Sequence, residues 1–213
     1  MRIYIIRHGE TERNKAGVLQ GWTDDPLNEA GRELAAITGR NMRPVKFDAC
    51  ISSPLKRARE TAEIVLRESG NGSVPVEFDD RIREISFGIM ENHRLDCGLI
   101  PLSEARLFLT DPFQCKRFPG GENVRDVAAR TQEFLKELCA RDDGKTYLVA
   151  LHGCCVRAML NMLYEDPQNY WHGRVPYNCA VNIVDAEKGS IRLIEDDRLY
   201  YDPSLAVDRY KLD

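Results

Sequence analysis

Short apolar runs alternate with segments of helical periodicity along most of the chain. The first run, Ile3–Ile6, is rich in β-favouring residues and free of turn residues, so it predicts a buried strand over residues 1–7. The same features predict three more strands, at residues 46–53, 74–79 and 145–151. Two late apolar segments, 179–185 and 190–195, flank Lys188-Gly189 and predict a hairpin there.

Helices are predicted between these strands, each with a start or stop signal. Asn28 is the expected N-cap of a helix that runs to about Met42. Ser53 is the expected cap of the next helix, with Pro54 at its first position. The Gly70-Asn71-Gly72 run is expected to close that helix.

The second half of the chain carries two further helical patterns. Asn123 and Asp126 have the spacing of a capping box, and an apolar stripe runs from Val124 to Leu138. Another helix is predicted over about Cys154–Tyr164, directly after the fourth strand.

This alternation of strands and helices predicts an α/β domain with a mostly parallel sheet. No linker divides the chain, so residues 1–213 are predicted to form one domain. Residues 86–120 are less regular and hold three prolines. We interpret them as an insertion over one edge of the domain, with a helix near 102–110.

Composition indicates an ordinary globular protein and narrows its partners. Of 213 residues, 43% are hydrophobic and 30% charged, with a net charge of −4 and a pI near 5.7. This balance argues against nucleic acid or an anionic membrane as partner. No apolar run has the length of a targeting or membrane-spanning segment. The seven cysteines form no C-x-x-C pair, which favours reduced, mostly buried thiols in a cytoplasmic protein over a zinc site or disulfides.

Two of the predicted strands end in similar residues. The first ends at Arg7-His8-Gly9, and the fourth is followed by His152-Gly153. In a parallel sheet both ends lie at the carboxyl edge, where ligands bind in open α/β folds. Arg57 is expected one turn into its helix at the same edge, with its side chain tilted back toward that edge.

Arginines, histidines and helix N-termini at one edge predict an anion site, which a phosphoryl group fits best. A neutral imidazole is a competent nucleophile, and Arg7 and Arg57 would lower the pKa of His8 and keep it neutral. Gly9 is expected to let the backbone approach the phosphate closely. Glu84, which follows the third strand, is the candidate acid for the departing alkoxide if its pKa is raised.

Each of these residues taken alone has an ordinary structural explanation. A lone histidine or arginine at a strand end is commonly a surface residue, and Cys154-Cys155 are more simply small buried hydrophobes than reactive thiols. The prediction of a site therefore depends on several strand ends meeting at one edge.

The same residues lie in motifs that resemble those of the histidine phosphatase superfamily, also called the phosphoglycerate-mutase-like family. The motifs, in the family's order, are RHGET (7–11), LQGWTDDPLNEAG (19–31), SSPLKRARETA (52–62), EISFGIMEN (84–92), PGGEN (119–123) and LHGCCVR (151–157). The resemblance thus extends through most of the chain. Three positions depart from it: Asn92 replaces a glycine, Asn123 a serine and Leu151 a serine.

The resemblance implies a three-layer α/β/α sandwich with a mostly parallel central sheet, an insertion covering the active site, and chemistry without a metal or another cofactor. It implies that His8 becomes a phosphohistidine. It also implies roles for the other motif residues: Arg7, Arg57 and His152 hold the phosphoryl oxygens, Glu84 protonates the leaving group, and Asn14, Gln20, Gly21 and Gly153 line the substrate pocket.

Three functions remain open at this point. The favoured one is a phosphatase in which water hydrolyses a phosphohistidine on His8, with a small phosphorylated metabolite as substrate. A cofactor-dependent phosphoglycerate mutase is the alternative. Family mutases carry a longer insertion than the 68 positions from Glu84 to His152 allow. A non-catalytic phospho-ligand-binding module is the third, and the intact set of polar residues argues against it. A homodimer is left open.

Overall fold

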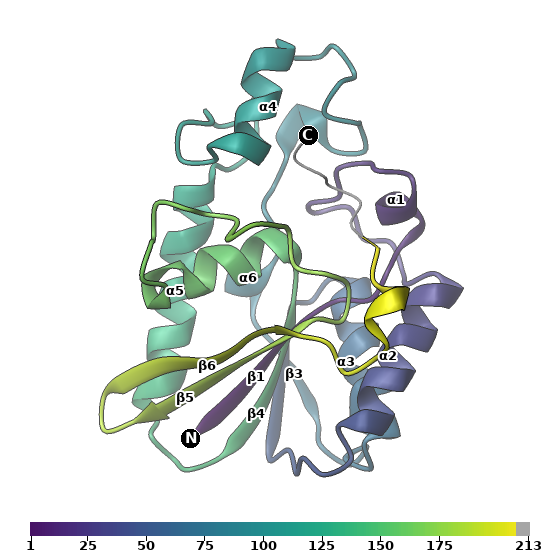
Figure 1. The fold of residues 1–213 in the computed structure, drawn as a ribbon, viewed down its shortest axis with the longest axis vertical. Coiled ribbons are helices and arrows are strands. Elements are labelled where there is room, and N and C mark those ends of the chain that lie inside the picture. The colour runs from purple at the N-terminus through teal and green to yellow at the C-terminus, as the bar shows by residue number, and fades with distance from the viewer. Residues whose placement is uncertain (208–213) are drawn as a thin grey trace.

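The computed structural model describes residues 1–207 and contains a six-stranded sheet in the order β3-β2-β4-β1-β5-β6 (Figure 1). Its strands are β1 (Arg2–Arg7), β2 (Ala49–Ser52), β3 (Val76–Phe78), β4 (Thr146–Leu151), β5 (Val181–Glu187) and β6 (Ser190–Arg198). The first four strands run parallel, β5 runs antiparallel to β1, and β6 runs antiparallel to β5. The predicted α/β class with a mostly parallel sheet is therefore confirmed.

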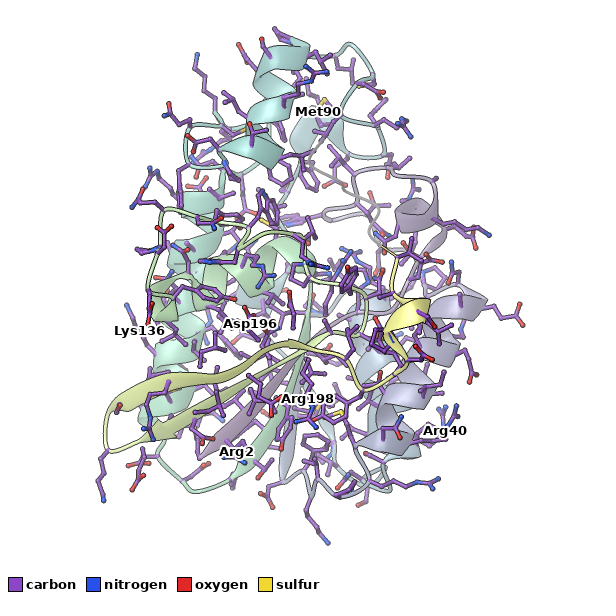
Figure 2. The ribbon with its side chains drawn as sticks, viewed as in Figure 1. Arg2, Arg40, Met90, Lys136, Asp196 and Arg198 are labelled. Carbon is purple, nitrogen blue, oxygen red and sulfur yellow. The ribbon has the colours of Figure 1, made fainter. Side chains whose placement is uncertain are left out.

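Helices cover both faces of the sheet, which makes three layers (Figure 1). The helices are α1 (Glu12–Lys15), α2 (Glu29–Asn41), α3 (Lys56–Glu68), α4 (Leu102–Thr110), α5 (Val124–Ala140) and α6 (Gly153–Leu160). On one face α2 and α3 pack together, and on the other α5 and α6 do so. Exposed charged side chains such as Arg40 and Arg198 lie on the outside (Figure 2).

Strand β1 contributes side chains to both hydrophobic cores, because successive side chains point to opposite faces of a sheet. Ile3 and Ile5 belong to the core beneath α5 and α6, and Tyr4 and Ile6 to the core beneath α2 and α3. Burial on both faces explains the unbroken apolar run that the sequence shows at this strand. The strand is thereby held rigidly up to its carboxyl end at Arg7.

Most predicted elements are present, with local differences at their ends. The late hairpin turns at Lys188 and Gly189, whose φ values of +50° and +80° match the left-handed region that a type I′ turn requires. The capping box of α5 and the helix at Leu102–Thr110 are also confirmed. The last predicted helix ends at Leu160 and continues as a short 3₁₀ turn, and the short helix α1 was not predicted.

The predicted start of α3 is wrong by two residues. The helix begins at Lys56, and its N-cap is Leu55, which makes no side-chain capping bond. Ser53 stays in the loop because its hydroxyl lies 2.8 Å from His152 Nε2, while Leu55 N–H is 3.4 Å from the same oxygen. The serine therefore belongs to the carboxyl edge of the sheet rather than to the helix.

The segment 86–120 lies beyond the carboxyl ends of the parallel strands, with α4 at its top (Figure 1). Ala105 and Phe108 are its buried helical residues. No helix within residues 1–207 is long and apolar enough to cross a membrane. All seven cysteines lie in that range, and five of them are buried, as predicted for most of these thiols.

Candidate active site

Strand β1 delivers Arg7 and His8 to the edge of the sheet, and the backbone beyond it fixes the imidazole. His8 N–H donates to the Leu151 carbonyl at 2.9 Å, which ties the two strand ends together. His8 Nδ1 lies 2.7 Å from the Gly9 carbonyl. A carbonyl only accepts, so Nδ1 carries the hydrogen and Nε2 is the unprotonated nitrogen. The ring therefore presents a nucleophilic nitrogen without needing any other base.

Gly9 also has a packing role that the sequence did not predict. A Cβ on Gly9 would lie 2.5 Å from the Gly31 carbonyl oxygen. The close contact brings the loop after β1 against the first turn of α2, and Gly9 N–H donates to Thr61 Oγ1 at 3.0 Å. The glycine thus permits the tight turn that aims His8.

Arg57 lies within the first turn of α3 and is fully buried. Its Nε is 3.3 Å from His8 Nε2, and its two terminal nitrogens donate at 2.7 Å to the carbonyls of Thr23 and Gly21. These fixed acceptors orient the planar guanidinium beside the imidazole. Removal from water lowers the pKa of Arg57 to about 10, so it stays charged at neutral pH.

His152 stands beside His8 with its ring centroid 5.2 Å away. Its Nε2 is 2.8 Å from Ser53 Oγ, and its buried Nδ1 has no partner among the described residues. Ser53 Oγ accepts the Leu55 N–H and can donate its own hydrogen to His152 Nε2, and in that arrangement the ring hydrogen lies on Nδ1. His152 then offers an unused donor.

We expect Ser53→Ala to lower kcat/KM by about tenfold, the worth of one lost hydrogen bond, because His152 loses the group that sets its tautomer. Steady-state hydrolysis of a phosphomonoester measures the change. Ser69→Ala is the matched control, since that serine is also buried on the α3 side but bonds the Leu66 carbonyl. An unchanged rate in Ser53→Ala would show that the tautomer does not depend on the serine.

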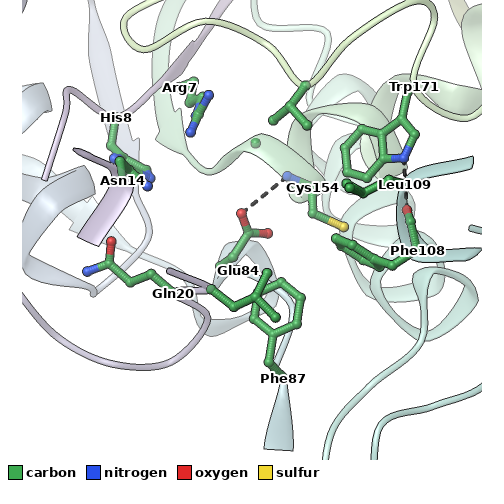
Figure 3. Close-up of a pocket in the computed structure, with 13 residues that line it drawn as sticks. Arg7, His8, Asn14, Gln20, Glu84, Phe87, Phe108, Leu109, Cys154 and Trp171 are labelled. Carbon is green, nitrogen blue, oxygen red and sulfur yellow. Dashed lines mark hydrogen bonds between the residues drawn. The ribbon is translucent and has the colours of Figure 1, made fainter. Parts of the chain in front are cut away.

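Glu84 reaches the site from the loop after β3 and meets the N-terminus of α6. One carboxyl oxygen accepts from Ile85 N–H at 2.9 Å and from Cys155 N–H at 3.2 Å. The other accepts from Cys154 N–H at 3.2 Å, the bond drawn in Figure 3. Burial nevertheless raises the pKa of Glu84, because these donors and Arg57 offset the desolvation only in part. A raised pKa is what an acid working near neutral pH requires.

Burial and neighbouring charge act in the opposite sense on the histidines. Burial, Arg57 and Arg7 together hold the pKa of His8 well below its usual range. The pKa of His152 is also lowered, by burial first and then by Arg57 and His8. Both imidazoles are therefore neutral at pH 7, as the sequence predicted for His8.

Arg7 is anchored at one end and unpaired at the other. One terminal nitrogen donates to the Pro176 carbonyl, whereas its buried Nε has no partner in the described part of the chain. Gly153 lets it approach, because a Cβ there would lie 3.3 Å from that Nε. The unpaired Nε of Arg7 and the unpaired Nδ1 of His152 are donors suited to an anion.

The pocket at this edge is polar on one side and apolar on the other (Figure 3). Its polar lining consists of Arg7, His8, Asn14, Gln20, Glu84, Gly153 and Cys154. Its remaining lining consists of Leu19, Phe87, Phe108, Leu109, Trp171 and Val175. Figure 3 shows that Phe108 and Trp171 face the pocket from the side opposite His8.

Gly21 is the predicted pocket residue that lies outside the lining. Its N–H donates to Glu91 Oε2 at 3.1 Å, and its carbonyl accepts from Arg57. A Cβ on Gly21 would lie 2.2 Å from both Glu91 Oε1 and the Ile85 carbonyl oxygen. Gly21 therefore supports Arg57 from behind, where only glycine fits.

Several supporting residues escaped the sequence analysis. Glu91 accepts from the backbone N–H groups of Gly21, Trp22 and Phe87, and so joins two loops. Glu91 lies in the EISFGIMEN motif (84–92), and that motif was the sequence signal that could have identified it. Arg130, which donates to the Glu84 carbonyl at 3.0 Å, lies in the ordinary helical pattern of α5, which gave no signal.

Each departure from the family motifs has a local explanation. Asn92 has a φ of +67°, in the left-handed region where asparagine is the common substitute for glycine. Asn123 caps α5 by accepting from Arg125 and Asp126 N–H, as a serine would. Leu151 is completely buried at the end of β4. These departures leave the polar cluster intact.

Fold and sequence together establish the class of protein. The family model of the histidine phosphatase superfamily (branch 1) matches residues 3–196. The chain belongs to this superfamily and is an enzyme of that kind.

Its relatives carry both mutase and phosphatase names. "Probable phosphoglycerate mutase GpmB" from Erwinia tasmaniensis is 29% identical over 188 residues, covering 88% of this chain and 86% of the relative. YhfR of Bacillus stearothermophilus is 28% identical with a TM-score of 0.85 over 99% of both chains. A phosphoserine phosphatase of Entamoeba histolytica, in complex with 3-phosphoglyceric acid, is 27% identical with a TM-score of 0.79, covering 92% and 96% of the two chains.

Proposed function

We propose that the protein is a phosphatase that hydrolyses a small phosphomonoester through a phosphohistidine on His8. The observation that carries the proposal is the unprotonated Nε2 of His8, which is set by the Nδ1 bond to Gly9 and accepts a hydrogen bond of 3.3 Å from Nε of buried Arg57. Arg7, Arg57 and His152 stabilise the phosphoryl oxygens, and Asn14, Gln20 and Gly153 contribute to the substrate pocket.

The first step transfers the phosphoryl group to the enzyme. The lone pair of His8 Nε2 attacks phosphorus, the ester P–O bond breaks, and the Glu84 carboxyl gives its proton to the departing oxygen. The products are an alcohol, a phosphohistidine and a Glu84 carboxylate.

The second step returns the enzyme to its starting state. A water attacks phosphorus and passes a proton to the Glu84 carboxylate. The P–N bond breaks, and its electron pair returns to His8 Nε2. Inorganic phosphate leaves, and both His8 and Glu84 are restored.

The apolar side of the pocket supports a phosphatase over a phosphoglycerate mutase. A phosphoglycerate carries a carboxylate, which needs a cation or several donors once it is removed from water. Among the described lining residues Arg7 is the one arginine or lysine, and it lies at the histidine side. Phe108 and Trp171 instead offer apolar surface, which suits a leaving group with an aromatic or aliphatic body.

Mutase activity stays the second candidate because the curated relatives are named for it. It requires the phosphohistidine to return its phosphoryl group to an organic acceptor rather than to water. The test must therefore follow both phosphate release and isomer exchange.

We expect benzyl phosphate to be hydrolysed with a kcat/KM about 10- to 100-fold above that of glycerol 1-phosphate, because its ring buries apolar area against Phe108 and Trp171. The measurement is the rate of phosphate release from benzyl phosphate, glycerol 1-phosphate and 3-phosphoglycerate. Interconversion of 3- and 2-phosphoglycerate that depends on bisphosphoglycerate, with little phosphate released, would reverse the assignment in favour of a mutase.

A further inference from the structure

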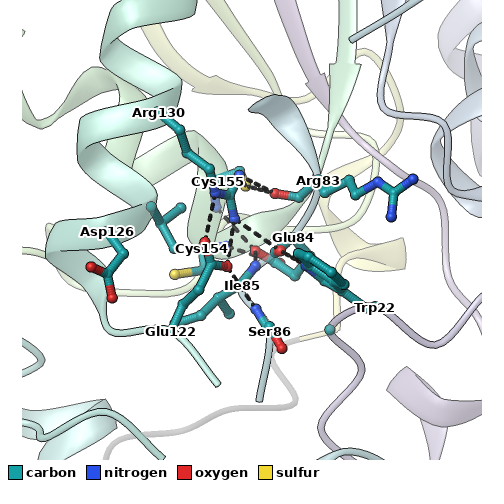
Figure 4. Close-up of polar contacts among 12 residues, drawn as sticks. Trp22, Arg83, Glu84, Ile85, Ser86, Glu122, Asp126, Arg130, Cys154 and Cys155 are labelled. Atoms are coloured by element: carbon teal, nitrogen blue, oxygen red, sulfur yellow. Dashed lines mark hydrogen bonds and ion pairs between the residues drawn. The ribbon is translucent and has the colours of Figure 1, made fainter. Parts of the chain in front are cut away.

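Arg130 on α5 binds the backbone of the segment that carries Glu84 (Figure 4). Its Nη1 donates to the carbonyls of Arg81 at 2.7 Å and Arg83 at 2.6 Å, and its Nη2 donates to the Glu84 carbonyl at 3.0 Å. The side chain is 18% exposed, so water supplies little alternative to these bonds. One guanidinium thus satisfies three carbonyls of an irregular loop.

Glu122 fixes the orientation of that guanidinium. Its two oxygens accept from Arg130 Nε and Nη2, each at 2.9 Å, in a bidentate pair. The same carboxylate accepts from Ser86 N–H at 2.9 Å, and the Ser86 carbonyl accepts from Glu122 N–H at 2.8 Å. Arg130 and Glu122 therefore hold the chain on both sides of Glu84.

The Glu84 side chain connects this segment to the N-terminus of α6. The Glu84 carboxyl meets the Cys154 and Cys155 N–H groups at 3.2 Å each, while His8 lines the same pocket. Bonds of this length leave little tolerance, because a shift of the backbone by 1 Å would break them. A small change in the loop would therefore move the acid away from the departing oxygen.

We propose that Arg130 and Glu122 are positioning residues for the general acid Glu84. The inference rests on the proposed function, in which Glu84 protonates the leaving group. Neither residue lies in the pocket lining, so both act through the backbone of residues 81–86. Loss of this hold affects the protonation step and leaves the nucleophile and the phosphoryl contacts in place.

The dependence on the leaving group separates positioning of the acid from general structural support. An alkoxide leaves only with a proton, whereas p-nitrophenolate leaves readily without one. Because kcat/KM reports the steps up to the first irreversible one, it reports phosphoryl transfer to His8 for both esters. Loss of the acid's position lowers kcat/KM for the alkyl ester far more than for the aryl ester.

The experiment compares kcat/KM for benzyl phosphate and p-nitrophenyl phosphate in Arg130→Met, Glu122→Gln and Glu84→Gln. We expect Arg130→Met to lose about 100-fold on benzyl phosphate, at the lower end of what general acid catalysis contributes, and under about fivefold on p-nitrophenyl phosphate. Glu122→Gln keeps one acceptor oxygen for Arg130. We therefore expect it to lower the rate on benzyl phosphate more than that on p-nitrophenyl phosphate, but by a smaller factor than Arg130→Met. Arg130→Lys should not restore the benzyl rate, because an ammonium lacks the planar fork.

Failure of the inference is distinguishable from failure of the proposed function. Suppose that Glu84→Gln lowers the rate mainly on the alkyl ester, while Arg130→Met lowers both rates equally. Arg130 then has only a structural role and does not position the acid. If Glu84→Gln lowers both rates equally, Glu84 is not the leaving-group acid, and the positioning proposal falls with that role.

A matched control keeps the result independent of folding. Arg32→Met breaks another clamp, in which Arg32 pairs with Glu60 at 2.5 Å and Glu60 holds the Leu27 N–H, between α2 and α3. We expect it to leave the ratio of the two rates unchanged. If Arg130→Met does not fold, Glu122→Gln decides, since equal losses on both esters would contradict the proposal.

Discussion

His8→Ala should abolish hydrolysis of phosphomonoesters, with a fall in kcat of about 10⁴-fold or more. The reason is that the imidazole is the proposed acceptor of the phosphoryl group, and its Nε2 is the unprotonated nitrogen, which accepts from Arg57 Nε at 3.3 Å. Phosphate release from p-nitrophenyl phosphate measures the loss, because that ester has little need of Glu84. A rapid quench with labelled substrate should also yield an acid-labile phosphoenzyme in the wild type and none in the variant.

His93→Ala is the control for this prediction, since His93 is exposed and its ring Nδ1 lies 2.8 Å from the Glu91 carbonyl, away from the pocket lining. It should retain full activity and the labelled phosphoenzyme. Substantial turnover by His8→Ala would rule out the phosphohistidine route, and label on His8→Ala would show that another residue is the nucleophile.

Arg57→Met should damage both activity and stability. We expect kcat/KM to fall by about 10²- to 10³-fold, because a buried charge beside the transferred phosphoryl group is lost. The carbonyls of Gly21 and Thr23 would lose their donor inside the protein, at about 1–3 kcal/mol each. Kinetics together with urea unfolding measure the two effects on the same preparation.

Lys56→Met provides the comparison from the adjacent position on α3. The Lys56 side chain is 54% exposed and pairs with Asp24 only at 3.6 Å, so little change is expected in rate or in free energy of unfolding. Arg57→Met with normal activity but lowered stability would show that Arg57 serves the loop alone and not the phosphoryl group.

The local sequence contained enough information for the sheet and for the ends of its strands. Ile3–Ile6 is buried on both faces, and such a strand must be apolar throughout, so its end at Arg7 is visible as an abrupt change. The same change occurs after Leu151. Since parallel strands end at one edge, the pairing of His8 with His152 follows from two local signals. The side-chain caps at Asn28 and Asn123 were equally local and are confirmed.

Only the tertiary structure decided which polar groups hold that edge together. Ser53 has the residue type and position of a cap, but its hydroxyl lies against His152, which is 99 positions away in the chain. Arg130 is 46 positions from Glu84 and sits in an unremarkable helical stripe. Contacts of this kind depend on how α5 and the β3 loop pack, and no spacing along the chain records them.

The apolar side of the pocket belongs to the same category. Phe87, Phe108 and Trp171 each fit an ordinary core pattern, and they meet only because α4 and the loop after α6 fold over one edge of the sheet. The sequence by itself therefore determined the family, the sheet and the meeting of the candidate site residues at one edge, because these depend on local patterns and on strand ends. The tertiary structure decided the hydrogen-bond partner of His152, the support of Glu84 and the apolar character of one side of the pocket, because each depends on side chains brought together from distant parts of the chain.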